Sequence, residues 1–520
     1  YVTVDSAREM EEEFFKLANS MDVIIIVAGV TVPGKYLGGN PITIAELNNW
    51  FKIIDKPLKI LAGPAARFGI GVRGGKVAEL PWKMRENFDI VIKGDPEIVV
   101  YRLFKERSVE FIEPNEKRED YALTNEFSVK GARIVEMHPN HGKNLIAEIE
   151  TYRGCPRFIT GGCSFCTEPL YGEPVFRDQR DIAREVEALH RIGVKFFRLG
   201  RQPDIFAYKA VGVGEEEFPK PSPIEVEKLF KSVVSAAPEL EVLHIDNVNP
   251  GTIAHHPEES REIAKIIVKY HTPGDVAAMG VESADPVVIK KNNLKASPEE
   301  SYLAIKIVNE VGSVRGWNGL PHLLPGVNFV YGLIGETKET YKLNYEFMKR
   351  VLDSGLMVRR INIRKVMAFP GTPMWRIGDR IIRKHKRVYD KYLKLVRARI
   401  DLPMLRRVVP KYTVLRRVYT EKIIDDRTYS RQIGSYPIMV VIPFTMDVGK
   451  FIDVVVTEHP HRSVMGLPYP IKINETPIRA LKSAPGITKS VARKIMLKRP
   501  FRSVAELREL LGEYSKYYEV

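Results

Sequence analysis

Cysteine is scarce in this chain of 520 residues: the only three lie within twelve positions, at Cys155, Cys163 and Cys166. Thiols gathered in one short segment cannot form the distributed disulfide framework of a small secreted protein, and an odd number leaves one unpaired. Cysteines this close together instead predict a local metal or cluster site.

Long hydrophobic runs are also absent. No stretch approaches the roughly 18 uninterrupted apolar residues of a membrane helix, and the apolar run at 23–28 has the length of a strand. The sequence therefore predicts no membrane partner and a cytoplasmic location. The chain opens with "YVTVD", a pattern typical of an interior strand, so we expect further residues upstream.

Histidine is absent before His138, and the glycine-rich loop at 33–41 lacks a G-x-G-x-x-G spacing. They do contain apolar runs at 22–29, 58–64 and 88–97, interrupted by Gly or Pro and separated by helical patterns. Such runs predict a parallel, Rossmann-like sheet covered by helices. A glycine-rich loop at 33–41 follows the first run, where folds of this type bind ligands.

A second alternation of strands and helices runs from about 145 to 375. Six or so β/α units in succession predict an α/β fold with a full or partial TIM barrel, whose loops converge on one face. The cysteines follow the first strand of this array, "IAEIETYRG", and so belong to that face. The later strands are expected at 196–200, 242–246, 276–283, 327–335 and 360–371.

The net charge is +15 and the pI is near 9.4, which suggests an anionic partner. Between Arg376 and Lys422 there are sixteen Lys or Arg against four Asp or Glu. This segment predicts either a solvated, basic helical linker or a surface that faces RNA, because phosphate neutralisation supplies most non-specific affinity. Beyond it, 434–473 is typical of a small β barrel or sheet, and the last forty-odd residues are again helical.

The cysteine spacing is C-x7-C-x2-C. Three thiolates can ligate three corners of a [4Fe-4S] cluster, which normally has four ligands, so that one iron stays open for a substrate or cofactor. A structural zinc site is the alternative, but it needs a fourth ligand, and His141 is the only histidine between 139 and 189. Chance clustering without any metal is the remaining alternative.

These motifs resemble those of the radical S-adenosylmethionine (SAM) enzymes. In that superfamily the open iron binds SAM, and reduction cleaves SAM to a 5′-deoxyadenosyl radical. Its first two cysteines are usually three residues apart, whereas here "PRFITGG" separates them. Five matches occur in order, several of them similar to anaerobic coproporphyrinogen oxidases: "RGCP" with "CSFC", "HIDNVNPGT", "GVESADPVVIKKNN", "YGLIGET" and "AFPGTPMW".

The resemblance implies a set of cofactor-binding residues, each following an apolar strand at the face where a barrel places its active site. Each could instead be a core or loop polar group. The implied contacts to SAM are Glu282 and Ser283, Asn247 and Asn249, Arg201 and Gln202, with Phe165 matching the aromatic residue before the last cysteine. The resemblance also implies an electron donor such as ferredoxin or flavodoxin.

The N-terminal sheet ending in "IVIKGDPEIVVYRL" resembles the domain that precedes the barrel in cobalamin-dependent radical SAM enzymes. The Asp-x-His-x-x-Gly cobalamin motif is absent, so a bound cobalamin would lack a histidine ligand from this region. Methylthiotransferases share a Rossmann-like first domain but need three further cysteines for a second cluster. The three cysteines available cannot supply them.

The segment "LKSAPGITKSVARKI" resembles a helix-hairpin-helix element that binds nucleic acid. The resemblance implies a turn at Gly486 and phosphate contacts from Lys489, Arg493 and Lys494, assisted by backbone N–H groups at the start of the second helix. A plain helical hairpin capped by Thr488 is the alternative. The β-rich region before it weakly resembles TRAM or OB-like RNA-binding barrels.

The leading hypothesis is a radical SAM enzyme that modifies a nucleoside in RNA, with tRNA the expected substrate. If cobalamin binds the first domain, the product is a methylated base. The alternatives are a nucleic-acid-binding protein with a structural or redox-sensing cluster, and a radical SAM enzyme that acts on a small molecule or protein. The expected units are a Rossmann-like, cobalamin-binding-like domain (1–120), the radical SAM barrel (140–375), a basic helical segment (376–430), a small β-rich module (431–474) and a helix-hairpin-helix (475–520).

Overall fold

The computed structural model describes residues 1–29, 42–71, 74–79, 87–110 and 112–520. The glycine-rich loop predicted at 33–41 lies outside the described residues. None of the described helices is long and apolar enough to cross a membrane.

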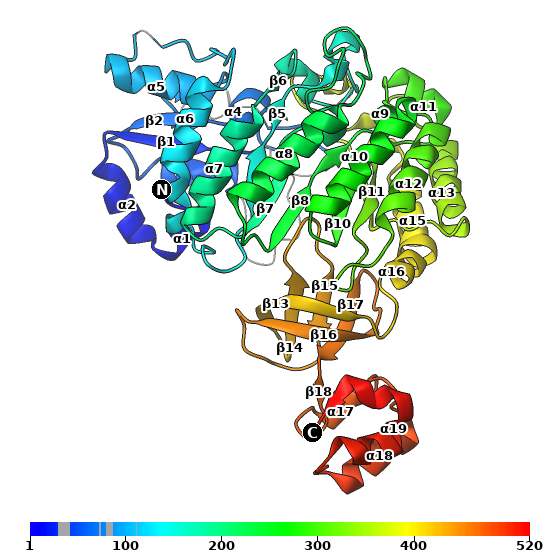
Figure 1. The fold of residues 1–520 in the computed structure, drawn as a ribbon. Coiled ribbons are helices and arrows are strands. Elements are labelled where there is room, and N and C mark those ends of the chain that lie inside the picture. The colour runs from blue at the N-terminus through cyan, green and yellow to red at the C-terminus, as the bar shows by residue number, and fades with distance from the viewer. Residues whose placement is uncertain (30–41, 72–73, 80–86, 111) are drawn as a thin grey trace.

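The N-terminal part contains a parallel three-stranded sheet in the order β1-β2-β3 (Figure 1). The opening residues are not a strand as predicted, because Thr3 caps a helix there by accepting a hydrogen bond from the backbone N–H of Ser6. The strands are β1 (Val23–Val27), β2 (Leu58–Ala62) and β3 (Ile90–Val91); the helices are α1 (Val4–Glu9), α2 (Glu11–Asn19), α3 (Ile44–Trp50), α4 (Pro64–Phe68), α5 (Pro96–Glu106) and α6 (Ala122–Lys130).

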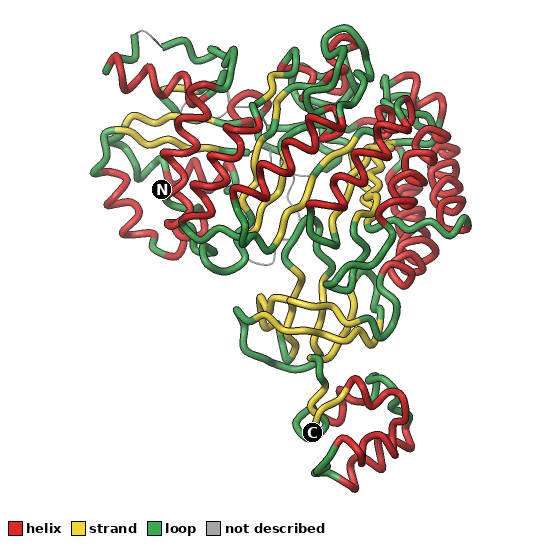
Figure 2. The backbone as a smooth tube through the Cα atoms, viewed as in Figure 1, coloured by secondary structure: helices red, strands yellow, loops and turns green. Residues whose placement is uncertain are grey.

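The central part is the predicted partial barrel. Its strands form two parallel sheets, β4-β7-β8 and β9-β10-β11-β12, and the chain passes from one to the other through Asp246. Helices cover the outside of this curved array (Figure 2). The strands are β4 (Ala147–Glu150), β7 (Phe196–Gly200), β8 (Val242–Ile245), β9 (Asn247–Val248), β10 (Asp275–Glu282), β11 (Leu323–Tyr331) and β12 (Arg360–Lys365).

The helices outside the barrel bury one face each against the strands. Helix α7, for example, buries Ile182, Val186 and Leu189, which are spaced three and four residues apart as an amphipathic helix requires. The helices of this part are α7 (Gln179–Arg191), α8 (Pro223–Ala236), α9 (Pro250–His255), α10 (Pro257–Tyr270), α11 (Pro286–Lys291), α12 (Pro298–Gly312), α13 (Lys338–Asp353), α14 (Arg380–Lys384), α15 (Lys386–Val396) and α16 (Leu402–Val408).

A closed five-stranded barrel follows, in the order β13-β14-β15-β17-β16. It begins at Val414, not at 431 as predicted, because Leu415 and Val418 are buried while Arg416 and Arg417 between them face solvent. The predicted basic helical segment is therefore helical only as far as Val408. The strands are β13 (Val414–Ile424), β14 (Arg427–Gln432), β15 (Met439–Ile442), β16 (Phe451–Glu458) and β17 (Ser463–Pro468).

The C-terminal residues form a small helical unit, whose Leu481, Ile495 and Leu507 share an apolar cluster with Val455 and Leu467 of the five-stranded barrel. Two short strands, β18 (Ile471–Lys472) and β19 (Tyr518–Glu519), pair in parallel and join its ends. In Figure 1 this unit and the five-stranded barrel lie below the central partial barrel, at the end away from β5 (Tyr152–Arg153) and β6 (Val175–Phe176). The helices are α17 (Ile478–Leu481), α18 (Lys489–Lys498) and α19 (Val504–Leu511).

Candidate active site

The cysteine loop begins just beyond the carboxyl end of β4. Cys155 directly precedes the short 3-10 helix Pro156–Thr160. The backbone N–H of Ser164 donates to the carbonyl of Asn292 at 2.9 Å, and the Ser164 hydroxyl donates to Asn292 Oδ1 at 2.7 Å. Through these two bonds Ser164 holds the segment with Cys163 and Cys166 against the end of α11.

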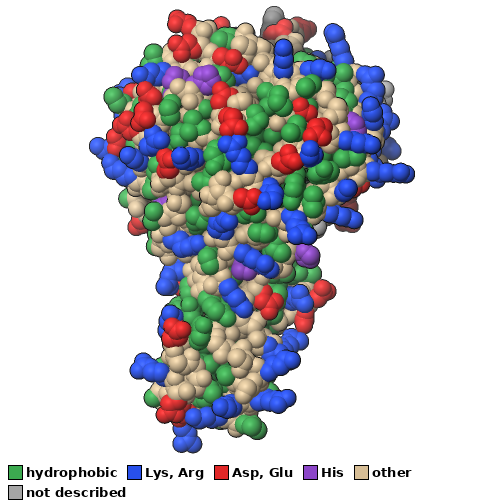
Figure 3. Space-filling model, turned by 90° about the vertical axis from the view of Figure 1, so that its right-hand side faces the viewer, with side chains coloured by type: hydrophobic (Ala, Val, Ile, Leu, Met, Phe, Trp, Pro, Cys, Tyr) green, Lys and Arg blue, Asp and Glu red, His purple; other side chains and the backbone are tan. Residues whose placement is uncertain are grey.

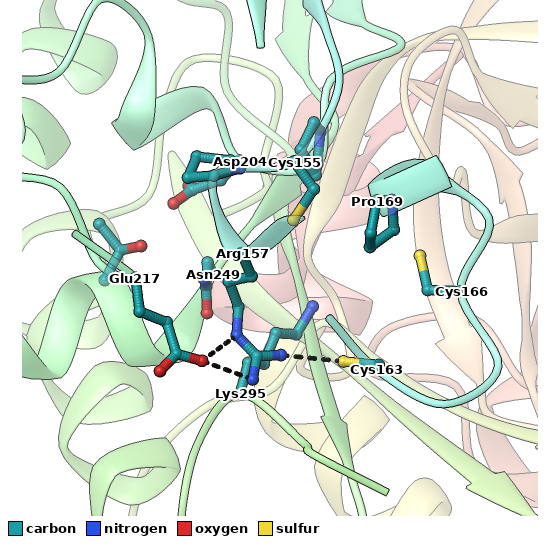
Figure 4. Close-up of a pocket in the computed structure, with 12 residues that line it drawn as sticks. Cys155, Arg157, Cys163, Cys166, Pro169, Asp204, Glu217, Asn249 and Lys295 are labelled. Carbon is teal, nitrogen blue, oxygen red and sulfur yellow. Dashed lines mark hydrogen bonds and ion pairs between the residues drawn. The ribbon is translucent and has the colours of Figure 1, made fainter. Parts of the chain in front are cut away.

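All three cysteines line one cavity (Figure 4). Figure 4 shows the sulfur atoms on three sides of this space, with the amine of Lys295 directed toward them. The other polar and charged side chains of the lining come from several loops that follow strands. They are Arg157, Asp204, Glu217, Asn249, Thr252 and Lys295.

Burial controls the protonation of the thiols. It raises the pKa of Cys155 to about 11 and raises that of Cys166 further, with the neighbouring thiols adding to both shifts. Metal ligation requires the thiolate, so a positively charged metal centre is needed to deprotonate these groups at neutral pH. Within the described ranges, no group of three or more His, Cys, Asp or Glu side chains is spaced to hold a single metal ion.

The extra residues between the first two cysteines supply a buried cation. Arg157 Nη1 donates to Cys163 Sγ at 3.1 Å. The same guanidinium forms an ion pair with Glu217 at 2.7 Å and donates to the backbone carbonyl of Asn293 at 2.9 Å. The departure from the usual cysteine spacing thus places a positive charge on a predicted cluster ligand. Sequence reasoning missed Arg157, and its place inside the insertion was the only available signal.

Glu282 ends β10 in a strained position on the inner side of the barrel. Its φ is +63°, its side chain is buried, and Oε2 has no hydrogen-bond partner among the described residues. Strain of this kind persists where the surrounding structure imposes it, which is often at functional sites. Burial raises the pKa of Glu282 to about 7, although Lys295 and Arg364 act in the opposite direction.

Lys295 lies between Glu282 and the cysteines. Burial lowers its pKa, but the charges of Cys163 and Glu282 outweigh this effect and the net shift is upward. A Cβ atom on Gly280 would collide with both the Glu282 carboxylate and the Lys295 amine, so this glycine leaves room for the pair. A carboxylate and an ammonium side by side can accept the amino and carboxylate groups of an amino acid.

Two polar residues that follow β7 and β9, Asp204 and Asn249, line the same cavity, whereas Asn247 does not. Asp204 is fully buried, accepts a hydrogen bond from the Phe206 N–H at 3.1 Å, and has its pKa raised to about 6 by burial. Asn249 lines the cavity, although its Oδ1 already accepts from the Gly251 N–H at 2.9 Å as the cap of α9. Asn247 donates to the backbone carbonyl of Gln202 at 3.3 Å.

Of the predicted cofactor-binding residues only Asn249 lines this cavity; besides Glu282 and Asn247, four others lie away from it. Ser283 is buried, with its hydroxyl accepting from the Asp285 N–H at 3.1 Å, and Phe165 packs in an apolar cluster beside Val288. Gln202 is buried and donates to the Leu199 carbonyl. The Arg201 side chain is 52% exposed, 3.9 Å from Glu150. The roles of the predicted residues toward SAM stay predictions.

The N-terminal sheet docks against the cysteine loop. Arg153, on β5, forms an ion pair with Asp95, which precedes α5. Arg67 donates to the backbone carbonyl of Leu170 at 2.6 Å, and its guanidinium lies 4.7 Å from the ring centroid of Tyr171. The N-terminal part therefore contacts the barrel beside the cysteine loop.

The partial barrel and its cysteine loop define a radical SAM architecture, and residues 149–348 match the family model of the radical SAM superfamily. The chain belongs to this superfamily. It is 47% identical to an uncharacterized protein of Methanocaldococcus jannaschii, over 90% of this chain and 85% of that protein. It is 40% identical to an uncharacterized protein of Archaeoglobus fulgidus, over 100% of this chain and 91% of that protein.

Among solved structures, the cobalamin-dependent SAM radical enzyme OxsB with aqua-cobalamin bound is similar with a TM-score of 0.46 and 13% identity. The likeness covers 74% of this chain and 48% of that one, so the chain spans about half the length of that enzyme. A similarity of this size does not establish a shared cofactor.

Membership of the superfamily implies a [4Fe-4S] cluster and SAM, and the site fits both. Three soft sulfur donors surround one cavity, and a buried carboxylate lacking a hydrogen-bond partner in the described chain lies beside an ammonium group. Cys155, Cys163 and Cys166 would hold the cluster, which supplies the electron that cleaves SAM. Arg157 stabilises negative charge on Cys163, and Glu282 with Lys295 would orient the amino acid part of SAM.

Proposed function

We propose that this chain is a radical SAM enzyme that modifies a nucleoside in RNA, with tRNA as the expected substrate. The observation that carries the RNA part is the exposed basic face of the C-terminal hairpin. Lys489, Arg493 and Lys494 all lie on α18 and are exposed. Within the described chain none of them has an ion-pair partner within 4.0 Å, so all three charges are available to phosphates.

The geometry of the hairpin supports the same proposal. Gly486 has a φ of +73° in the turn, a conformation that favours glycine. Thr488 caps α18 by accepting from the Val491 N–H at 3.2 Å, which leaves the first N–H groups of the helix pointing outward. A helix start of this kind attracts anions through its N–H groups and dipole.

The surface charge of the lower part of the molecule is a further support. Figure 3 shows Lys and Arg side chains prominent over the five-stranded barrel and the C-terminal unit. Closed five-stranded barrels are one of the folds that bind oligonucleotides. A basic surface around such a barrel would guide a long polyanion toward the radical SAM barrel.

Methylation is the expected outcome if cobalamin binds beside the N-terminal sheet. The docking of that sheet on the cysteine loop through Arg153 and Arg67 supports this, because a cofactor held there would lie next to the SAM site. Ferredoxin or flavodoxin is the expected electron donor. Cobalamin retained by the anaerobically purified protein would give its own visible absorption spectrum.

The first experiment compares nucleosides by mass spectrometry in RNA from cells with and without this protein. The proposal predicts that one modified nucleoside disappears from tRNA in the cells that lack it. Unchanged nucleosides in every RNA fraction, together with RNA binding by the purified protein, would instead favour a nucleic-acid-binding protein with a structural cluster.

The second experiment measures tRNA binding as a function of salt. Changing Lys489, Arg493 and Lys494 to Gln should weaken binding and flatten the plot of log affinity against log salt by about 2, because each lost phosphate contact removes about 0.7–0.9 from the slope. The matched control changes Lys16, Lys265 and Lys338 to Gln, which are also exposed and unpaired in the described chain. Equal slopes for the two triple variants would contradict a hairpin contact to RNA.

A further inference from the structure

Strand β12 turns a row of polar side chains toward the inside of the radical SAM barrel. Ile361 belongs to the core beneath the helices, and Ile363 packs against it. Because side chains alternate along a strand, the opposite, inner face carries Arg360, Asn362 and Arg364.

The two arginines of this row have no acidic partner in the part of the chain that the structure describes. Neither forms an ion pair within 4.0 Å of an Asp or Glu there. The charged or titratable groups that face Arg360 are Tyr436, Arg364, Arg462 and Asp246, in order of their effect on it. Two of these are cations, so the surroundings of Arg360 lack negative charge.

Asp246 is the only acid in that set, and it is already engaged. Its Oδ1 accepts a hydrogen bond from the Tyr436 hydroxyl at 2.8 Å, and Oδ2 lies 3.6 Å from Arg198. Arg360 instead stacks on the ring of Tyr436, with 4.0 Å between its Cζ and the ring centroid. Burial lowers the pKa of Arg360 to about 10, which still leaves it charged at neutral pH.

This row is continuous with the SAM-binding end of the barrel. Arg364 is close enough to Glu282 to affect its pKa, and it is exposed. The Asn362 side-chain oxygen accepts a hydrogen bond from Arg364 Nη2 at 2.9 Å, and Asn328 on the adjacent strand lies 3.1 Å from the same amide. The two cations therefore lie along one face of β12, beginning near Glu282.

Arg360 is half-buried without a carboxylate partner, which is costly, and an oxyanion would offset that cost. Arg364 is exposed and adds a second guanidinium, and guanidinium groups match phosphate oxygens, which accept charge-assisted hydrogen bonds. We propose that Arg360 and Arg364 form an oxyanion subsite on the inner wall of the barrel that binds a phosphate group of the substrate. This rests on the proposed function, in which the substrate is a nucleotide of RNA, and assigns its phosphate a place relative to the reacting carbon.

The test measures binding of inorganic pyrophosphate to the reconstituted full-length protein by isothermal titration calorimetry, with acetate as a second probe. Arg364→Gln and Arg360→Gln should each weaken pyrophosphate binding at least 10-fold. Arg364 is exposed, so its variant does not depend on the Tyr436 stack that could disturb folding in Arg360→Gln. The control is Arg399→Gln, an exposed arginine in the outer helical layer, and it should stay within 2-fold of the unchanged protein.

Pyrophosphate binding that is absent, or equal in all four proteins, would overturn the proposal. Acetate binding as tight as pyrophosphate binding would assign the subsite to a carboxylate and overturn it too. A fall in SAM affinity as large as the fall in pyrophosphate affinity would assign the arginines to SAM, with the same consequence. Formation of 5′-deoxyadenosine by the unchanged protein and by Arg399→Gln is measured in parallel, because its absence defeats the proposed function and leaves the pyrophosphate result standing.

Discussion

Glu282 is the residue at which burial and charge conflict most clearly in the site. Burial raises its pKa to about 7, so the folded protein holds a proton there that the unfolded chain releases above about pH 4.3. Stability from this proton is fully present below the pKa of the unfolded chain and is lost as the pH rises through about 7.

The expected result is a pH-dependent difference between the cluster-free protein and its Glu282→Gln variant. From pH 5 to pH 8 the free energy of unfolding of the unchanged protein should fall by about 2.5 kcal/mol relative to the variant. Denaturant unfolding at the two pH values measures this difference. Glu262→Gln, at an exposed position on α10, is the control and should show no such trend.

A Glu282→Gln difference that is the same at pH 5 and pH 8 would show that the carboxylate is already ionised across this range. Its proposed pairing with the amino group of SAM would then need no proton release. The pH series therefore decides the charge state of the site before SAM binds.

Some residues of the site can be predicted from a sequence pattern, and others are identified only when the fold places them beside the cysteines. Cys155, Cys163 and Cys166 were predictable because their spacing is unusual and their chemistry specific. Lys295 was not, since an isolated basic residue in a loop carries no signal until the fold places it near a sulfur, and Arg157 had only its place between the first two cysteines as a signal. Conversely, nothing local to Ser283 showed that its hydroxyl would accept from the Asp285 N–H.

Among the structural elements, the loop between β14 and β15 has the most unusual role. It leaves the five-stranded barrel and enters the base of the radical SAM barrel. The Ser435 N–H donates to His244 Nδ1 at 2.8 Å, and the Tyr436 hydroxyl donates to Asp246 at 2.8 Å. Asp246 joins β8 to β9, so this loop fixes the point at which the barrel strands bend.

Tyr436→Phe removes that hydrogen bond and leaves a buried carboxylate oxygen without it. The free energy of unfolding should fall by about 1.5–3 kcal/mol, the usual loss for a hydrogen bond to a charged group. The control is Tyr345→Phe, because the Tyr345 hydroxyl has no hydrogen-bond partner among the described residues. Equal stability of the two variants, measured by denaturant unfolding, would contradict a bracing role for the loop.

Elements were predictable where the periodicity was strong. Strands β7, β8 and β10 lie within one residue of their expected ranges, because each is an apolar run with clear ends, whereas β11 begins at Leu323 instead of 327 and β12 ends at Lys365 instead of 371. Strand β13 was missed because its burial does not alternate: Arg416 and Arg417 are adjacent and exposed, at an irregularity in the pairing with β16 between buried Leu415 and Val418. The strand predicted at the start of the chain was wrong because the Thr3 cap outweighs the strand preference of the neighbouring valines.

At the scale of the whole molecule, the proposed function assigns chemistry and RNA binding to opposite ends. The radical SAM barrel and the docked N-terminal sheet surround the cysteines at one end, while the five-stranded barrel and helical unit lie at the other (Figure 1). The loop carrying Tyr436 connects the two ends physically. RNA bound below would have to extend along the molecule to bring a nucleoside to the cavity, which suits a long and structured RNA.

The most direct test of the account is reductive cleavage of SAM by the anaerobically reconstituted protein. We expect the unchanged protein to form 5′-deoxyadenosine, and we expect Cys155→Ala, Cys163→Ala and Cys166→Ala each to abolish its formation with loss of the cluster absorption. Formation of 5′-deoxyadenosine at an undiminished rate by any of the three variants, or none by the unchanged protein with a full cluster, would contradict the central claim.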